Sequence, residues 1–137
     1  MSLEQHVTSL ELSKKLKELG VPQGGVFGYY ENTFHPEHPF IVLTSTFPRI
    51  ENPANWICSA FLASELGEML PLFLFDKDGR ECDLHIWPQS KRTGIKGWSI
   101  YYSGASGGVH AAIFEESEAD ARAKMLIHLL EEGLLKI

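Results

Sequence analysis

The segment best suited to covalent catalysis is 104–108, Gly-Ala-Ser-Gly-Gly, which matches the G-x-S-x-G pattern of serine hydrolases. In those enzymes a strand precedes the serine and a helix follows it, because the sharp turn between them exposes the hydroxyl. Here the segment that follows, 109–114, is predicted to be another strand. A hairpin turn explains the glycines, and a catalytic Ser106 is the alternative.

A second candidate chemistry is metal binding by histidines. His35 and His38 enclose a proline and a glutamate, and a zinc site needs three or four converging ligands. His85 or His110 could in principle complete such a set. Prolines within the segment disfavour the helix that would bring both imidazoles to one side. Surface-loop histidines are therefore expected, and a metal site at His35 and His38 stays an alternative.

A third candidate is a cysteine–histidine nucleophile formed by Cys82, Asp83 and His85. Successive residues of a strand point to opposite faces, so Cys82 falls on the face of Leu84 and Ile86. His85 falls on the other face. The pattern is typical of a small cysteine in the core.

The polar face of the same strand carries Asp83, His85 and Trp87, and the next strand adds Trp98 and Tyr101. Together these side chains predict an exposed aromatic patch. Such patches are enriched at binding sites. The alternative is that the Trp87 ring packs under the neighbouring loop or against the first helix.

The final helix is predicted over about 117–132, with Ser117 as its N-cap. Met125 and Leu129 lie to one side of its apolar stripe, and they either widen the packed face or form a small contact surface. His128 is expected on the solvated side. The stripe itself consists of Ala119, Ala123, Leu126, Ile127, Leu130 and Leu134.

The charge balance argues against a nucleic-acid partner. The chain has 12 basic and 18 acidic side chains, a net charge of −6. Its basic cluster is Lys91, Arg92 and Lys96, in a predicted loop. Because phosphate backbones are bound mainly through clustered positive charge, nucleic-acid binding is expected to be weak at most.

The remaining elements follow from periodicity and turn residues. A capping box of Thr8 and Glu11 begins a first helix over about 9–19, and Gly20 ends it. A short helix is predicted at 62–69, and strands at 26–30, 40–47, 56–61, 72–75, 81–87, 97–102 and 109–114. Several strands are joined by short turns, and the helices lie outside these runs of strands. This order predicts an α+β domain with a mainly antiparallel sheet of about five strands.

Size and composition indicate one cytoplasmic domain spanning 1–137. Residues 1–7 are expected to be flexible or vector-derived. The two cysteines form no disulfide framework, which fits a reducing compartment. No apolar run is long enough to span a membrane.

Four segments together resemble a family of small uncharacterised bacterial proteins, many of them encoded by prophages. They are 8–21 (TSLELSKKLKELGV), 63–71 (ASELGEMLP), 118–127 (EADARAKMLI) and 129–134 (LLEEGL). The resemblance implies a bacterial, mobile-element origin and a cytosolic setting. It implies no reaction, cofactor or site.

The sequence therefore predicts a protein-interaction domain that binds another protein or itself, with a homodimer as one option. The surface would use the aromatic patch or the side of the last helix that carries Met125 and Leu129. No cofactor, metal or catalytic residue is predicted. The alternatives are a small hydrolase or metal-dependent enzyme using Ser106 or the histidine loop, and a weak nucleic-acid binder.

Overall fold

The computed structural model describes residues 2–45, 55–89, 96–104 and 109–137. A 3-10 turn, η1 (Leu3–Gln5), precedes three helices: α1 (Leu10–Glu18), α2 (Ala63–Met69) and α3 (Glu118–Glu131). The strands are β1 (Phe27–Tyr30), β2 (Phe40–Leu43), β3 (Trp56–Ala60), β4 (Phe73–Phe75), β5 (Glu81–Pro88), β6 (Trp98–Gly104) and β7 (Val109–Glu115). Every predicted helix and strand has its counterpart, although residues 46 and 47 of the predicted second strand lie outside the described residues.

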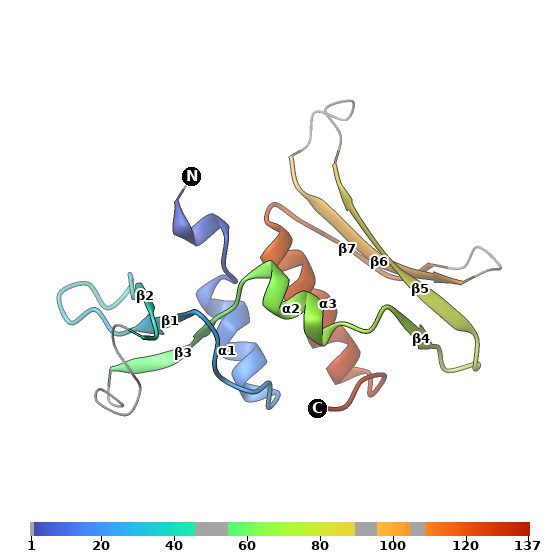
Figure 1. The fold of residues 1–137 in the computed structure, drawn as a ribbon, viewed down its shortest axis with the longest axis horizontal. Coiled ribbons are helices and arrows are strands. Elements are labelled where there is room, and N and C mark those ends of the chain that lie inside the picture. The colour runs from blue at the N-terminus through green and yellow to red at the C-terminus, as the bar shows by residue number, and fades with distance from the viewer. Residues whose placement is uncertain (1, 46–54, 90–95, 105–108) are drawn as a thin grey trace.

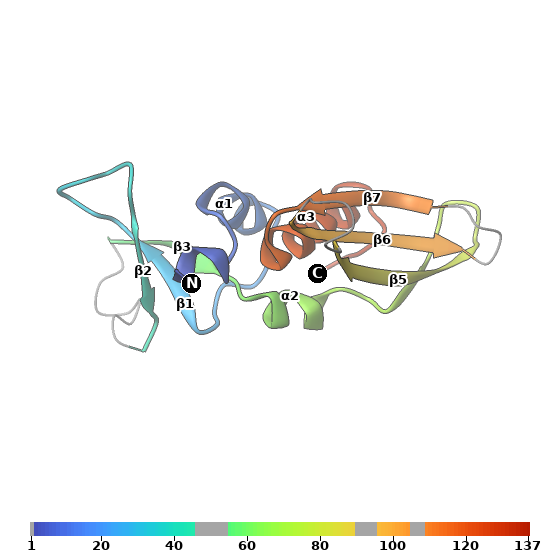
Figure 2. The ribbon, with the colours of Figure 1, turned by 90° about the horizontal axis from the view of Figure 1, so that it is seen from above.

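The strands form two antiparallel sheets, β2-β1-β3 and β4-β5-β6-β7. The α+β class is confirmed, whereas the expectation of one sheet of about five strands is wrong. The reason lies in α2, which carries the chain from β3 at one end of the molecule to β4 at the other (Figure 1). The helices lie between the two sheets and cover one face of the four-stranded sheet (Figures 1 and 2).

The larger core is formed by the helices and the inner face of β4–β7. Met125 and Leu129 on α3 are fully buried in it. The prediction that they form a contact surface is therefore wrong. The backbone of α2 lies close to α3 at Gly67, where an added Cβ would come within 2.6 Å of the Arg122 guanidinium. Because α3 is covered by both the sheet and α2, its buried face is wider than the predicted stripe. Ile127, a member of that stripe, is nevertheless only partly buried.

A second, smaller core lies against the three-stranded sheet, around Tyr29, Cys58 and Ala60. Val7 is 1% exposed in this core, and its backbone bridges to Leu62. The chain is thus anchored from its first turn onward. Val7 is therefore part of the fold, and the expectation that residues 1–7 are flexible or vector-derived otherwise stays a prediction.

The two cores meet at the buried Thr8, which joins four segments. Its backbone N–H donates to the Phe61 carbonyl at 2.9 Å, and its hydroxyl oxygen accepts from the Phe61 N–H at 3.0 Å. The same hydroxyl lies 2.6 Å from the Ser13 hydroxyl on α1. The Tyr29 hydroxyl of β1 donates to the Thr8 carbonyl at 2.6 Å. One residue therefore fixes the N-terminal segment, α1, β1 and the chain after β3 relative to one another.

Because the Thr8 hydroxyl is used in this way, it does not cap α1 as the sequence predicts. Ser9 is the N-cap, and its hydroxyl accepts from the Leu12 N–H at 3.4 Å. The Ser9 N–H donates at 2.8 Å to the carboxylate of Asp120, in the first turn of α3. As predicted, Ser117 caps α3, accepting from the Asp120 N–H at 3.1 Å. The beginnings of α1 and α3 are thus tied together.

Replacing Thr8 with valine should lower the free energy of unfolding by about 1–3 kcal/mol, because it leaves the buried Phe61 N–H without its acceptor at nearly unchanged volume. Thr33→Val, at an exposed loop position, should change it by no more than about 0.5 kcal/mol. Urea unfolding at neutral pH measures both values. Equal shifts in the two variants would contradict a stabilising role for the Thr8 hydroxyl.

Replacing Gly97 with alanine should destabilise the fold by about 1–3 kcal/mol. Gly97 has φ +155°, and an added Cβ would lie 2.6 Å from the Glu115 carbonyl oxygen and 2.5 Å from the Phe114 ring. Gly24→Ala is the matched control, since its added Cβ would meet no atom within 4 Å apart from those of Gly24 and its two chain neighbours. Thermal unfolding should show Gly24→Ala unchanged or slightly stabilised, and a similar loss in both variants would refute the steric explanation.

Candidate functional site

The face of the four-stranded sheet that points away from the helices is uncovered by any described helix or strand (Figures 1 and 2). We call it the outer face. Cross-strand register places the outward side chains in rows, such as Phe73 opposite Asp83 and His85 opposite Tyr101. Among the residues whose side chains are described, those on the outer face are Phe73, Phe75, Glu81, Asp83, His85, Trp87, Ser99, Tyr101, Ser103, Ala112 and Phe114.

Aromatic rings dominate this outer face. Phe73, Phe75 and Trp87 are 53%, 58% and 57% exposed, and Phe114 is 43% exposed. Phe73 and Phe75 make an edge-to-face pair with ring centroids 6.3 Å apart. Such a concentration of exposed rings is uncommon on a surface that meets only water, because exposed apolar area is unfavourable.

At the centre of the outer face, the His85 and Tyr101 rings stack. Their centroids are 5.0 Å apart and their planes differ by 13°. The two residues are direct cross-strand partners on β5 and β6, so the backbone ladder holds the stack in place. The pair forms a flat platform in the middle of the outer face.

The structure brings four of the predicted patch residues together: Asp83, His85, Trp87 and Tyr101. Trp98 does not join them. It lies on the inner face, packed against the core on the side of Ile100. Its separation from Tyr101 is an odd number of residues, and strand alternation therefore puts the two rings on opposite faces.

Sequence reasoning missed Phe73, Phe75 and Phe114. The signal was present in the alternation of β4, where the buried Leu74 separates two exposed phenylalanines. In β7 the corresponding signal is interrupted. Ala111 has φ +54° and sits at an irregularity in the register opposite Tyr101, so counting alternate residues along the sequence fails there.

The outer face is acidic in its charged groups. It carries Glu81 and Asp83, and none of its described side chains is a lysine or arginine. Lys96 lies elsewhere, in a hollow that it shares with Glu116 and Asp120. Lys91 and Arg92 lie outside the described residues. A phosphate backbone would therefore find no positive charge on the described part of the outer face.

The histidine loop is held by its own hydrogen bonds. The Asn32 side chain accepts from the N–H groups of Phe34 and His35 and donates to the His38 carbonyl. His35 lies 3.7 Å from the Glu37 carboxylate. No group of three or more His, Cys, Asp or Glu side chains placed to hold a metal ion occurs in the part of the chain that the structure describes. Ser106, the hydrolase candidate, lies outside that part.

The cysteine–histidine nucleophile is also excluded by geometry. Cys82 lies on the inner face and is 3% exposed, whereas His85 lies on the outer face. Both cysteines are free thiols. Burial raises the pKa of the Cys58 thiol to about 11 and also raises the pKa of Cys82. These thiols are suited to packing rather than to nucleophilic attack.

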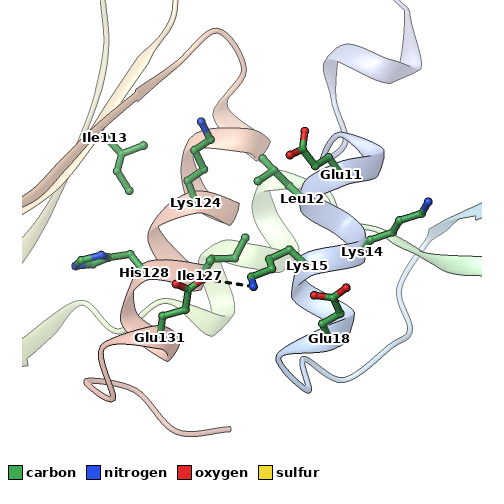
Figure 3. Close-up of a pocket in the computed structure, with 10 residues that line it drawn as sticks. All are labelled: Glu11, Leu12, Lys14, Lys15, Glu18, Ile113, Lys124, Ile127, His128 and Glu131. Atoms are coloured by element: carbon green, nitrogen blue, oxygen red, sulfur yellow. Dashed lines mark ion pairs between the residues drawn. The ribbon is translucent and has the colours of Figure 1, made fainter.

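A groove of about 670 Å³ runs between α1 and α3 on another side of the molecule (Figure 3). Its charged side chains neutralise one another: Lys15 lies 3.8 Å from Glu131, and Lys124 is paired with Glu115. His128 lines this groove beside Lys124 and Glu131, but it is only partly exposed and its Nε2 is buried, so the expectation of a solvated side chain is wrong. The groove holds no arrangement of nucleophile, base and orienting group.

No protein-family model matches this chain, and neither a curated protein nor a solved structure resembles it at a significant level. The resemblance to small, often prophage-encoded bacterial proteins therefore stays a prediction. None of the described helices is both long and apolar enough to cross a membrane.

The buried thiol of Cys58 and the buried phenol of Tyr102 predict a loss of stability at alkaline pH. Burial raises the pKa of Cys58 from its ordinary 9.0 to about 11 and that of Tyr102 from 10.0 to about 12. Both groups ionise more readily in the unfolded chain, so their contribution to stability is complete below about pH 9 and declines as the pH rises through the folded-state values. Urea unfolding at pH 8, 9, 10 and 11 should show this decline.

Cys58→Ala is the discriminating variant. Measured relative to its own stability at pH 8, it should lose less stability between pH 9 and pH 11 than the wild type does. An identical decline in the two proteins would show that the Cys58 thiol does not contribute.

Proposed function

We propose that the protein is a small cytoplasmic interaction domain that binds another protein through the outer face of its four-stranded sheet. The observation that carries the proposal is the set of rings on one uncovered face: Phe73, Phe75, Trp87 and Phe114 are all substantially exposed. The two free, buried thiols support the cytoplasmic setting.

Burial of these rings provides the driving force. Each Å² of apolar surface removed from water contributes about 25 cal/mol, and large aromatic side chains are enriched among the residues that dominate binding energy. Phe and Trp have only two side-chain torsions, so little conformational freedom is lost when they are covered.

The outer face is also preorganised. β5 and β6 pair continuously from Cys82–Gly104 to Pro88–Trp98, which fixes the positions of His85, Trp87 and Tyr101 before any partner arrives. A rigid sheet avoids the ordering cost that a loop would incur on binding. The His85–Tyr101 stack provides a flat centre against which a partner side chain can pack.

The charges of the outer face restrict the partner. Glu81 and Asp83 are uncompensated by basic groups on the described part of this face, and the whole chain carries −6. A partner surface that combines apolar side chains with hydrogen-bond donors or positive charge is complementary to it. An acidic partner would be repelled.

The proposal is tested with a face variant, Phe75→Ser with Trp87→Ser. A matched control is Phe34→Ser with Phe40→Ser, which removes two exposed rings, 87% and 53% exposed, at the other end of the molecule. Retention of proteins from a lysate of the source cells is measured by quantitative mass spectrometry. We expect a protein retained by the wild type and by the control to fall at least about tenfold with the face variant.

A purified candidate partner then allows titration calorimetry with the same three proteins. Circular dichroism checks that both variants remain folded, as expected for exposed positions. Equal retention by the face variant and the control would refute the proposal, as would a wild type that retains no protein specifically.

A further inference from the structure

The described strands leave four sheet edges, β2 and β3 in one sheet and β4 and β7 in the other. An exposed edge presents unpaired N–H and C=O groups to which another chain can add a strand. β2 and β4 are short, with four and three residues, and short edges offer little to pair with. The longer edges, β3 and β7, differ in how they are treated.

The β3 edge is closed by side chains from its own chain. The Ile57 carbonyl accepts from the Lys17 ammonium at 2.8 Å, and the Ser59 N–H donates to the Gln23 side chain at 2.8 Å. Just beyond the strand, the Phe61 N–H donates to the Thr8 hydroxyl. Backbone groups on the side of β3 that faces away from β1 are thus already bonded within the chain, which disfavours the addition of a further strand there.

Among the described residues, no side chain closes the β7 edge from Ala111 to Glu115 in this way. β7 has seven residues and pairs with β6 on one side only, and Figure 2 shows it along the rim of the sheet. After the irregularity at Ala111, Ala112 leads into a regular section, Ile113–Glu115, which lies opposite Trp98–Ile100. The protection of this edge is limited to the charged Glu115 at one end and the irregularity at Ala111 at the other, and Ala112–Phe114 carries no lysine, arginine or proline.

The side chains of this section form a projection and a hollow two residues apart. Phe114 is large and 43% exposed. Ala112 is small and exposed, and the surface above it forms a hollow of about 380 Å³, bounded by Ser99, Tyr101, Ile113 and Phe114. A strand that carries both a projection and a hollow is complementary in shape to an antiparallel copy of itself.

We infer that a second copy of this chain adds to the β7 edge in an antiparallel pair centred on Ile113. In a two-fold pair each contact occurs twice, so this register places Phe114 of each copy opposite Ala112 of the other, within direct cross-strand contact. A register centred on Ala112 or on Phe114 would instead place alanine opposite alanine or phenylalanine opposite phenylalanine. Of these three registers, only the one centred on Ile113 places a phenylalanine over the hollow of each copy.

The resulting dimer joins two four-stranded sheets into one of eight strands. Its outer faces are continuous, since a two-fold axis perpendicular to the sheet keeps both on the same side. The inference shares Phe114 with the proposed function, but the dimer uses the backbone edge of β7 and leaves Phe73, Phe75 and Trp87 exposed for a partner.

Sedimentation equilibrium of the purified protein tests the inference without any partner. We expect a monomer–dimer equilibrium. Phe114→Ala, which removes the projection, and Ala112→Phe, which fills the hollow, should each raise the dimer Kd at least about tenfold. The double variant Ala112→Phe with Phe114→Ala exchanges projection and hollow and should return the Kd to near the wild-type value. Phe73→Ala, on the opposite edge strand, is the control and should leave it unchanged.

Amide hydrogen exchange supplies a second measurement, in which exchange over 112–115 should slow as the protein concentration rises. A protein that is monomeric up to millimolar concentration overturns the inference. The inference is also overturned if Phe114→Ala and Ala112→Phe both leave the dimer Kd unchanged, or if the double variant does not return the Kd toward the wild-type value. The Phe75→Ser, Trp87→Ser variant should dimerise normally, so failure of partner binding and failure of dimerisation are separately visible.

Discussion

The arrangement of the whole molecule depends on the burial of one hydroxyl group. Thr8 is completely inaccessible to water, and a buried hydroxyl is tolerated only when its hydrogen bonds are made. Its partners come from α1 and from the chain that leaves β3, while its carbonyl receives the Tyr29 hydroxyl. These bonds fix the smaller core beside the helices. α1, which these bonds hold, also packs against α3, and α3 covers the inner face of the four-stranded sheet.

Local patterns in the sequence were sufficient to predict each helix and strand, because caps, prolines and apolar periodicity act over a few residues. They could not assign strands to sheets, since β3 and β4 are separated only by the short α2 and nothing local says that they diverge. The same limit explains α3. The spacing of Met125 and Leu129 shows that they lie beside the main stripe, but only the position of α2 decides that they are covered.

On the candidate surface, too, local patterns placed some residues correctly and could not place others. Alternation along β5 correctly placed Asp83, His85 and Trp87 on one face and Cys82 on the other. Within β6 the assignment of Trp98 was wrong, because Trp98 and Tyr101 are an odd number of residues apart and strand alternation therefore puts them on opposite faces. In β7 an irregularity at Ala111 shifts the register, so Phe114 could be placed only once the pairing with β6 was known.

The bond between the Ser9 N–H and the Asp120 carboxylate joins residues 111 positions apart in the chain. During synthesis the N-terminal helix emerges first, but this amide finds its acceptor only when the last helix has left the ribosome. Non-local contacts of this kind slow folding, because the intervening chain must be ordered before they form. The nascent protein therefore spends most of its synthesis without the contact that ties its two ends together, with its apolar helix faces open to chaperones.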